Sequence, residues 1–400
     1  MSLINNGGSM RFNSKALPLI SQRYLRSSLV VVLVAAMFVQ HILVAQTKQP
    51  ANEEKKKDPS FHIANMTNLG IRALNELSKG DKNTVVCPLL LYNTLSLLLL
   101  GAEGQTAKEI EGVLGFEKNE LEGYSKVYEN VLNSKSIWRS FSYEMSFDYP
   151  ESIRPGKKYQ EISSKYFKMS FAKIPDAPLK ANDLWRKFSV TSKASFASDW
   201  GRRFEVKFTR KRDFFNSNNS PKSVLFMKER GTHWYYSDKL VQAVIKDYKN
   251  FNAVFILLVP RERNGISKLL SLTYGDIKYL LKHQDYREGT MEMPKVIINS
   301  KKSLKTALEK MGVLLTFREQ KADFSSMWPV PAYIDNIESS VTLELSEERT
   351  DIKNEVTMLG GVLGGPEGSP IEVIADHPYM FIIYDEELGL PLFIGVVYEP

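Results

Sequence analysis

The sequence predicts an α+β fold, because helical patterns gather in the first third of the chain and strand patterns dominate the rest. Between residues 60 and 132, apolar residues recur at three- and four-residue spacing. After residue 138 come short runs rich in β-branched and aromatic residues. The last two of these runs, 377–384 and 391–398, follow a long polar, glycine-rich segment at 346–370. Loops of that length are uncommon in compact domains and are usually functional or disordered.

The predicted helices follow one another along the first third of the chain. An amphipathic helix begins near Ser60. Pro88 opens an almost wholly apolar helix, which must be buried. Thr106, with Glu109 three residues later, predicts the capping box of a third helix, and residues 120–132 predict a fourth.

Strand patterns cover most of the remainder. One helical interval, 303–311, interrupts them, and no internal repeat is visible. The predicted strands are 138–149, 167–174, 189–200, 224–226, 232–236, 241–248, 253–259, 291–299, 334–345 and the two terminal runs.

Composition and charge are those of an ordinary globular chain. Its 400 residues are 43% hydrophobic and 25% charged, which suffices for one large core or two smaller ones. The net charge of +7 is uneven, because residues 1–45 hold four basic residues and no acid. The remaining charge of +3 is too balanced to predict a nucleic-acid-binding surface.

The N-terminus predicts secretion. An apolar run at 29–39 follows Arg23 and Arg26 and leads to the small residue Ala45, as in a cleaved signal peptide. The run is short for a membrane-spanning helix, so an uncleaved anchor is the alternative. The predicted parts are a signal peptide at 1–45, a polar linker at 46–58 and a single domain at 59–400.

Cysteine and asparagine usage fits a secreted protein without internal disulfides. The single cysteine, Cys87, lies in an apolar run and is expected to be buried. Asn65 and Asn218 each begin a glycosylation sequon, which predicts two surface glycans.

One local basic run stands out at 202–212. It is either a solvated face or a site for an acidic polysaccharide or another acidic partner. Its basic residues are Arg202, Arg203, Lys207, Arg210, Lys211 and Arg212.

The chain carries no strong catalytic or metal-binding motif. It has no Gly-x-Ser-x-Gly, no His-Glu-x-x-His and no paired Cys/His spacing, and its five histidines are scattered. We therefore expect a monomer that is not an enzyme and needs neither cofactor nor metal.

Six ordered phrases resemble the serpin family of serine protease inhibitors over roughly residues 59–400. The resemblance implies helices clustered around a large mixed or antiparallel main β-sheet, with an exposed reactive-centre loop at about 346–370. Trp200 would lie beneath the point where this loop joins the sheet. The matching phrases are 83–110, 200–204, 293–295, 321–327, 377–379 and 392–395.

The resemblance also implies a mechanism. In inhibitory serpins a protease cleaves the loop, stays acyl-linked and is carried along as the loop inserts into the main sheet as an added strand. Insertion buries alternate side chains, and Thr350, Ile352 and Asn354 are the set expected to face inward. Burying Asn354 without a partner costs about 1–3 kcal/mol. The hinge residues are Glu347, Glu348, Arg349, Thr350, Ile352 and Asn354.

This sequence departs from inhibitory members at the hinge and beneath the sheet. Arg349 stands where they carry glycine, and 352–355 replaces a run of alanine-like residues. In the polar cluster that controls sheet opening, Leu90 and Tyr92 replace serines. At the other two positions of that cluster, Ser192 replaces an asparagine and Ser339 replaces a histidine. A separate departure is the connection at 185–189, which is much shorter than in the family.

The position of the scissile bond has two solutions. Counting forward from the hinge places it between Leu363 and Gly364, which suits a protease with an apolar primary pocket. Counting back from Pro370 places it near Glu367. Two functions follow: a secreted, non-inhibitory or weakly inhibitory serpin that binds a partner or ligand, or a serine protease inhibitor cleaved near Leu363.

Overall fold

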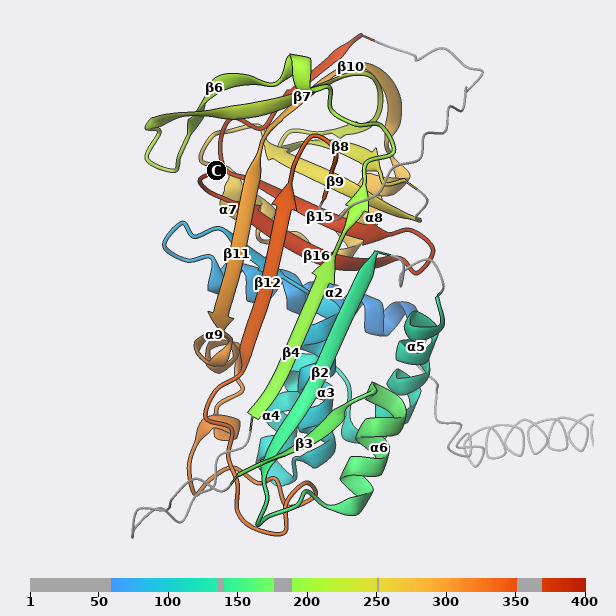
Figure 1. The fold of residues 1–400 in the computed structure, drawn as a ribbon, viewed down its shortest axis with the longest axis vertical. Coiled ribbons are helices and arrows are strands. Elements are labelled where there is room, and N and C mark those ends of the chain that lie inside the picture. The colour runs from blue at the N-terminus through green and yellow to red at the C-terminus, as the bar shows by residue number, and fades with distance from the viewer. Residues whose placement is uncertain (1–58, 135–139, 176–188, 250–251, 351–368) are drawn as a thin grey trace, which may run out of the picture. The chain divides into compact units, whose positions relative to one another are not determined.

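The computed structural model describes residues 59–134, 140–175, 189–249, 252–350 and 369–400. They belong to one compact unit, Lys57–Pro400. Helices and two large sheets make up this unit, so the α+β prediction is confirmed (Figure 1). None of the helices within these ranges is long and apolar enough to cross a membrane.

In the view of Figure 1, helices α2, α3 and α4 lie behind the strands of the sheet that contains β2 and β4, which is called the main sheet below. In α3 every residue except Leu100 is buried, as its apolar sequence predicts. The α-helices are α2 (Pro59–Leu77), α3 (Pro88–Gly101), α4 (Gly104–Leu114), α5 (Leu121–Asn133), α6 (Lys157–Phe167), α7 (Ile266–Leu269), α8 (Tyr274–Lys282) and α9 (Lys305–Met311).

Two helix predictions were wrong. α4 begins at Gly104 with Glu103 at its N-cap, so Thr106 does not cap it. The Thr106 hydroxyl instead accepts a hydrogen bond from the Asp323 backbone, and the Glu109 carboxylate accepts one from Leu314. Helix α6 was missed, and Phe167, assigned to a strand, is its last residue.

The main sheet has the strand order β3-β2-β4-β12-β13-β5, with β11 beside β12. β12 pairs with β4 in parallel only over 338–340, and beyond that point β13 lies between β12 and β5. Its strands are β2 (Phe141–Pro150), β3 (Ser170–Ile174), β4 (Ser189–Phe196), β5 (Ser198–Asp199), β11 (Val296–Ser303), β12 (Glu338–Leu345) and β13 (Arg349–Thr350).

The second sheet has the order β1-β16-β15-β9-β8-β7-β10-β14, with β6 paired to β7. The two terminal runs form its neighbouring interior strands β15 and β16, which are buried along their whole length. Its strands are β1 (Thr84–Val86), β6 (Arg210–Phe215), β7 (Pro221–Ser237), β8 (Val241–Asp247), β9 (Ala253–Pro260), β10 (Asp285–Pro294), β14 (Ile371–Ile374), β15 (Tyr379–Asp385) and β16 (Leu390–Val397).

Several predicted strands needed new boundaries. The runs 224–226 and 232–236 belong to the single long strand β7. The run 291–299 is divided at Lys295 between β10 and β11, which belong to different sheets. The run 334–345 becomes a strand only at Glu338.

Candidate functional site at the loop hinge

The candidate site is the point where the segment after β12 turns back into the main sheet. There Arg349 and Thr350 form β13, in which Thr350 pairs with Leu345 of β12 and with Ser198 of β5. Thr350 is fully buried, and its hydroxyl is 2.9 Å from the Tyr248 hydroxyl. The family resemblance favoured this inward orientation over the alternative set of residues. Arg349 and Thr350 of the hinge are thus already part of the sheet.

Trp200 lies directly under the turn that leads into β13. Its indole nitrogen donates to the Ser346 carbonyl at 2.9 Å, and its backbone nitrogen donates to the Glu348 carbonyl at 3.3 Å. The indole stacks on Tyr248 with 4.9 Å between ring centroids. The backbone of the turn is therefore held against Trp200, which is itself stacked on Tyr248.

Glu347 fixes the side of the same turn. Its carboxylate accepts a hydrogen bond from the Thr209 hydroxyl at 2.9 Å and pairs with the Lys295 ammonium at 2.7 Å. Burial raises the pKa of Glu347, but the hydrogen bonds that its carboxylate accepts, from Lys295 and Thr209 among others, and the charge of Lys295 lower it by more. The pKa of Glu347 therefore lies below its ordinary value. The carboxylate is therefore held ionised at the hinge.

This pairing predicts a pH dependence. A carboxyl whose pKa is depressed by folding contributes stability above its unfolded pKa and loses it as the pH falls through the folded value. Glu347→Gln is therefore expected to lower the melting temperature at pH 7, and the difference from wild type should shrink below the ordinary value of 4.5. Melting curves between pH 7 and pH 3 measure it, and a difference that stays constant with pH would contradict the pairing.

The bond between Tyr248 and Thr350 predicts a coupled pair. Tyr248→Phe leaves the buried Thr350 hydroxyl without its partner and is expected to lower the free energy of unfolding by about 1 kcal/mol. Thr350→Val removes the other partner, so the double variant should cost little more than either single one. Denaturant unfolding of the four proteins measures this coupling, and purely additive losses would argue against the bond.

A buried ion pair below the hinge escaped the sequence analysis. Lys246 of β8 pairs with Glu229 of β7 and also donates to the Arg202 carbonyl, and both side chains are buried. Burial lowers the pKa of Lys246, although Glu229 opposes the shift. Burial, together with the charges of Lys246 and Arg202, also lowers the pKa of neighbouring His233 to about 4. A lysine directly after the apolar residues 243–245, in the predicted strand 241–248, was the available signal.

The comparisons with known proteins agree on one family. The family model "Serpin (serine protease inhibitor)" matches residues 64–183 and 178–400, which is most of the chain. The chain belongs to the serpin family. Serine protease inhibition is therefore its family's general activity.

Relatives of this serpin come from distant organisms. It is 26% identical over 355 residues to serine protease inhibitor 42Dd of Drosophila melanogaster, covering 81% of this chain and 93% of that protein. It is 24% identical to alpha-1-antiproteinase of Ovis aries, covering 90% and 93%. A solved structure of native protease nexin-1 with heparin has a TM-score of 0.73 at 17% identity, covering 86% of this chain and all of that one. The thermophilic serpin tengpin in its native state also has a TM-score of 0.73, at 20% identity, covering 86% and 95%. These two structures establish the fold.

The four residues that the family resemblance assigns to a sheet-opening cluster are partly apolar. Leu90 and Tyr92 are buried in α3, and the Tyr92 hydroxyl donates to the Leu114 carbonyl at 3.2 Å. Ser192 and Ser339 lie opposite each other in the short β4–β12 pairing. Within the described residues, the short pairing that joins β4 to β12 therefore includes both of these serines.

Most of the predicted basic run is already paired with acids. Arg202 lies 3.6 Å from Glu229, Arg203 lies 3.5 Å from Asp199, and Lys207 lies 2.5 Å from Glu205. Each of these three cations thus has one carboxylate beside it and remains largely exposed. The basic residues of β6 differ, because Arg210 and Arg212 share one buried carboxylate, Glu292.

The two predicted glycosylation sites have different surroundings. Asn218 is exposed at the tip of the β6–β7 hairpin. The side-chain nitrogen of Asn65 is buried against Gly115, and Thr67 of the same sequon is fully buried. A glycan on Asn65 would have to displace these neighbours, whereas Asn218 has no such obstacle, and glycosylation at both positions stays a prediction.

Several predicted residues lie outside the described part of the chain. They are Ile352 and Asn354 of the hinge, the scissile candidates Leu363, Gly364 and Glu367, the N-terminal segments 1–45 and 46–58, and most of the interval 185–189.

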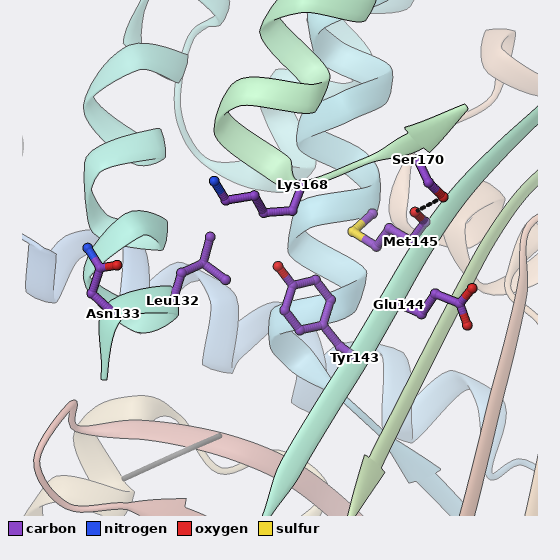
Figure 2. A pocket seen from close by; sticks show the side chains of 7 residues that line it. All are labelled: Leu132, Asn133, Tyr143, Glu144, Met145, Lys168 and Ser170. Carbon is purple, nitrogen blue, oxygen red and sulfur yellow. Dashed lines mark hydrogen bonds between the residues drawn. The ribbon is translucent and has the colours of Figure 1, made fainter. Parts of the chain in front are cut away.

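A hollow of about 640 Å³ lies between the end of α5, the end of α6 and β2 (Figure 2). Figure 2 shows Lys168, Leu132 and Tyr143 pointing toward one another across it. Its other charged group, Glu144, lies 3.5 Å from Lys193. The described lining thus offers an ammonium and two hydroxyl groups, but no nucleophile beside a base. Its residues are Leu132, Asn133, Tyr143, Glu144, Met145, Lys168 and Ser170.

Proposed function

We propose that this serpin is non-inhibitory or weakly inhibitory and acts by binding a partner or ligand, not as an enzyme. The observation that carries the proposal is the register of β13. Thr350 faces Leu345 and Ser198, so an inserted loop that continued this register would place residue 354 between Val341 and Ala194. Both neighbours are buried and apolar. The Asn354 amide would find no side-chain partner there, at a cost of about 1–3 kcal/mol.

The residues beneath the sheet support the same conclusion. Insertion requires β4 and β12 to separate at the pairing of Ser192 with Ser339. A polar cluster can exchange hydrogen bonds as strands part, whereas the buried Leu90 side chain cannot. Slow insertion favours release of the protease before it is distorted, so the loop would be cleaved as a substrate.

A panel of elastase-, chymotrypsin- and trypsin-type proteases tests this function. The expected result is cleavage of the loop with little covalent complex on denaturing electrophoresis. A covalent complex formed at near-equal stoichiometry with any of these enzymes would overturn the proposal.

The second candidate function is inhibition of a serine protease by suicide-substrate insertion, with cleavage near Leu363. The hinge geometry favours it, because Thr350 is already inserted and bonded to Tyr248. On either side of Asn354, the other residues that would follow on the inward face, Ile352 and Val356, are apolar. The same panel separates the two functions, since only this one gives a stable complex.

Secretion and glycosylation are part of the proposal. Secreted material is expected to begin near Gln46 and to carry a glycan on Asn218, whose hairpin tip is exposed. N-terminal sequencing and the loss of mass after removal of N-glycans check both points. A chain that keeps residues 1–45 would show that the apolar segment is an anchor.

Partners of this serpin are proposed to include a serine protease and an acidic polysaccharide. The family supports the first. For the second, the support is the basic strand β6 and the likeness to the fold of protease nexin-1, whose structure was solved with heparin.

A further inference from the structure

The hollow between the end of α5, the end of α6 and β2 has apolar walls and a single cation at its rim. Its volume of about 640 Å³ is that of a small-molecule site. Met145 is buried, and Leu132 and Tyr143 are half-buried, so these three side chains form an apolar surface. Figure 2 shows Lys168 lying across the hollow from Leu132 and Tyr143. An apolar chain placed there contacts three side chains and lies below an ammonium group.

Lys168 has a backbone conformation that lysine rarely adopts. It is the C-cap residue of α6, with φ of 54° and ψ of 30°, in the left-handed region. Glycine is the residue that such a cap favours, because a side chain adds strain there. The chain nevertheless places a lysine at this position, and its side chain points into the hollow (Figure 2). Strain at a charged residue beside a hollow indicates a role for the side chain in binding rather than in folding.

The Lys168 ammonium is available to a ligand. Within the described ranges, no acid forms an ion pair with it. The acid of the described lining, Glu144, lies 3.5 Å from Lys193, and Figure 2 shows its carboxylate pointing away from Lys168. The Ser170 hydroxyl already donates to the Met145 carbonyl at 3.1 Å. The hollow therefore presents one positive charge at the edge of an apolar surface.

We propose that this hollow binds a long-chain carboxylic acid. The carboxylate accepts a charge-assisted hydrogen bond from Lys168, and the hydrocarbon chain lies against Leu132, Tyr143 and Met145. The Tyr143 hydroxyl, which is neutral at pH 7, faces the same space as a second donor (Figure 2). One cation beside apolar walls matches one anionic group on an apolar body, whereas a polyanion needs several cations. The proposal rests on the proposed function in that it names a ligand class, and it does not depend on loop insertion.

Calorimetric titration of the full chain with dodecanoate, kept below the concentration at which micelles form, tests the proposal. We expect saturable binding with equimolar stoichiometry. Octanoate should bind at least about tenfold more weakly, because its shorter chain buries less apolar surface. Dodecanol should also bind about tenfold more weakly, because it lacks the charge that pairs with Lys168. Equal affinity for dodecanol and dodecanoate, or no saturable binding of dodecanoate, would overturn the proposal.

Three variants locate the site. Lys168→Met removes the charge and keeps most of the stem, so dodecanoate binding should weaken about tenfold. Lys168→Gly should weaken binding as much without lowering the melting temperature, because glycine adopts the left-handed conformation without strain. Lys158→Met, at the other end of α6, is the matched control and should leave the affinity unchanged. An equal loss in Lys158→Met and Lys168→Met, or a lower melting temperature in Lys168→Gly, would contradict a binding role for Lys168.

Vesicles of anionic phospholipid distinguish a membrane surface from a free acid. We expect the chain to bind dodecanoate and not to sediment with the vesicles. Sedimentation with vesicles in the absence of saturable dodecanoate binding would assign the hollow to a membrane and overturn the proposal. Protease trapping is measured separately without lipid. Failure of dodecanoate binding therefore leaves the claim about loop insertion untouched, and efficient trapping would leave the dodecanoate site untouched.

Discussion

Replacing Asn354 with valine is expected to turn this serpin into a better protease trap. Continuing the register of β13 places residue 354 between Val341 and Ala194, where a valine side chain can pack and an amide cannot hydrogen-bond. Removing a penalty of about 1–3 kcal/mol would speed insertion roughly 5- to 160-fold if the full penalty is present in the transition state. The fraction of protease caught as covalent complex should rise, and quantitative denaturing electrophoresis measures it.

Lys353→Val is the matched control for this experiment. Residue 353 falls on the outward face in the same register, so the substitution should leave trapping unchanged. If both variants raise trapping equally, loop hydrophobicity rather than burial of the amide limits insertion. If neither does, Asn354 is not the obstacle.

Replacing Glu292 with alanine is expected to lower stability much more than removing one partner of an exposed ion pair. Lys228, Arg210 and Arg212 would then face one another without their common carboxylate. Removing one partner from a buried ionic group typically costs about 3–5 kcal/mol. Denaturant unfolding monitored by tryptophan fluorescence should show a clearly lower midpoint.

An exposed ion pair provides the comparison. Glu338 lies 3.4 Å from Lys301, and their side chains are 56% and 73% exposed. Such pairs contribute about 0–1 kcal/mol, so Glu338→Ala should shift the midpoint little. Equal shifts in the two variants would mean that Glu292 does not anchor the three cations.

The fold could be predicted because its strongest signals are local. Continuous apolar runs in the sequence predict the helix that begins at Pro88 and the two buried terminal strands. Helix α6 was missed because its buried side, Tyr159, Ser163 and Phe167, contains a serine and is surrounded by polar residues. The division at Lys295 was missed because nothing in a continuous β pattern shows that the chain passes from one sheet to another.

The site was predictable only in part. Alternation left two sets of inward residues open, and only the resemblance to the family favoured the set with Thr350. Its partner Tyr248 is 102 residues away, and Glu347 pairs with Lys295, which lies between β10 and β11, so sequence spacing could not indicate either contact. The basic run showed the charges of 202–212 but not the acids facing them. The arginines of β6 differ from the cations before them because both pair with one buried carboxylate, Glu292, which lies outside that run.

The central claim is that the reactive loop of this serpin inserts poorly, and thermal unfolding before and after loop cleavage tests it most directly. An inserted loop adds a strand to the main sheet and raises the melting temperature strongly, whereas a loop that stays out adds nothing. We predict almost no change for the cleaved wild type and a clear rise for cleaved Asn354→Val. A large rise in the melting temperature of the cleaved wild type would contradict the claim that the loop inserts poorly.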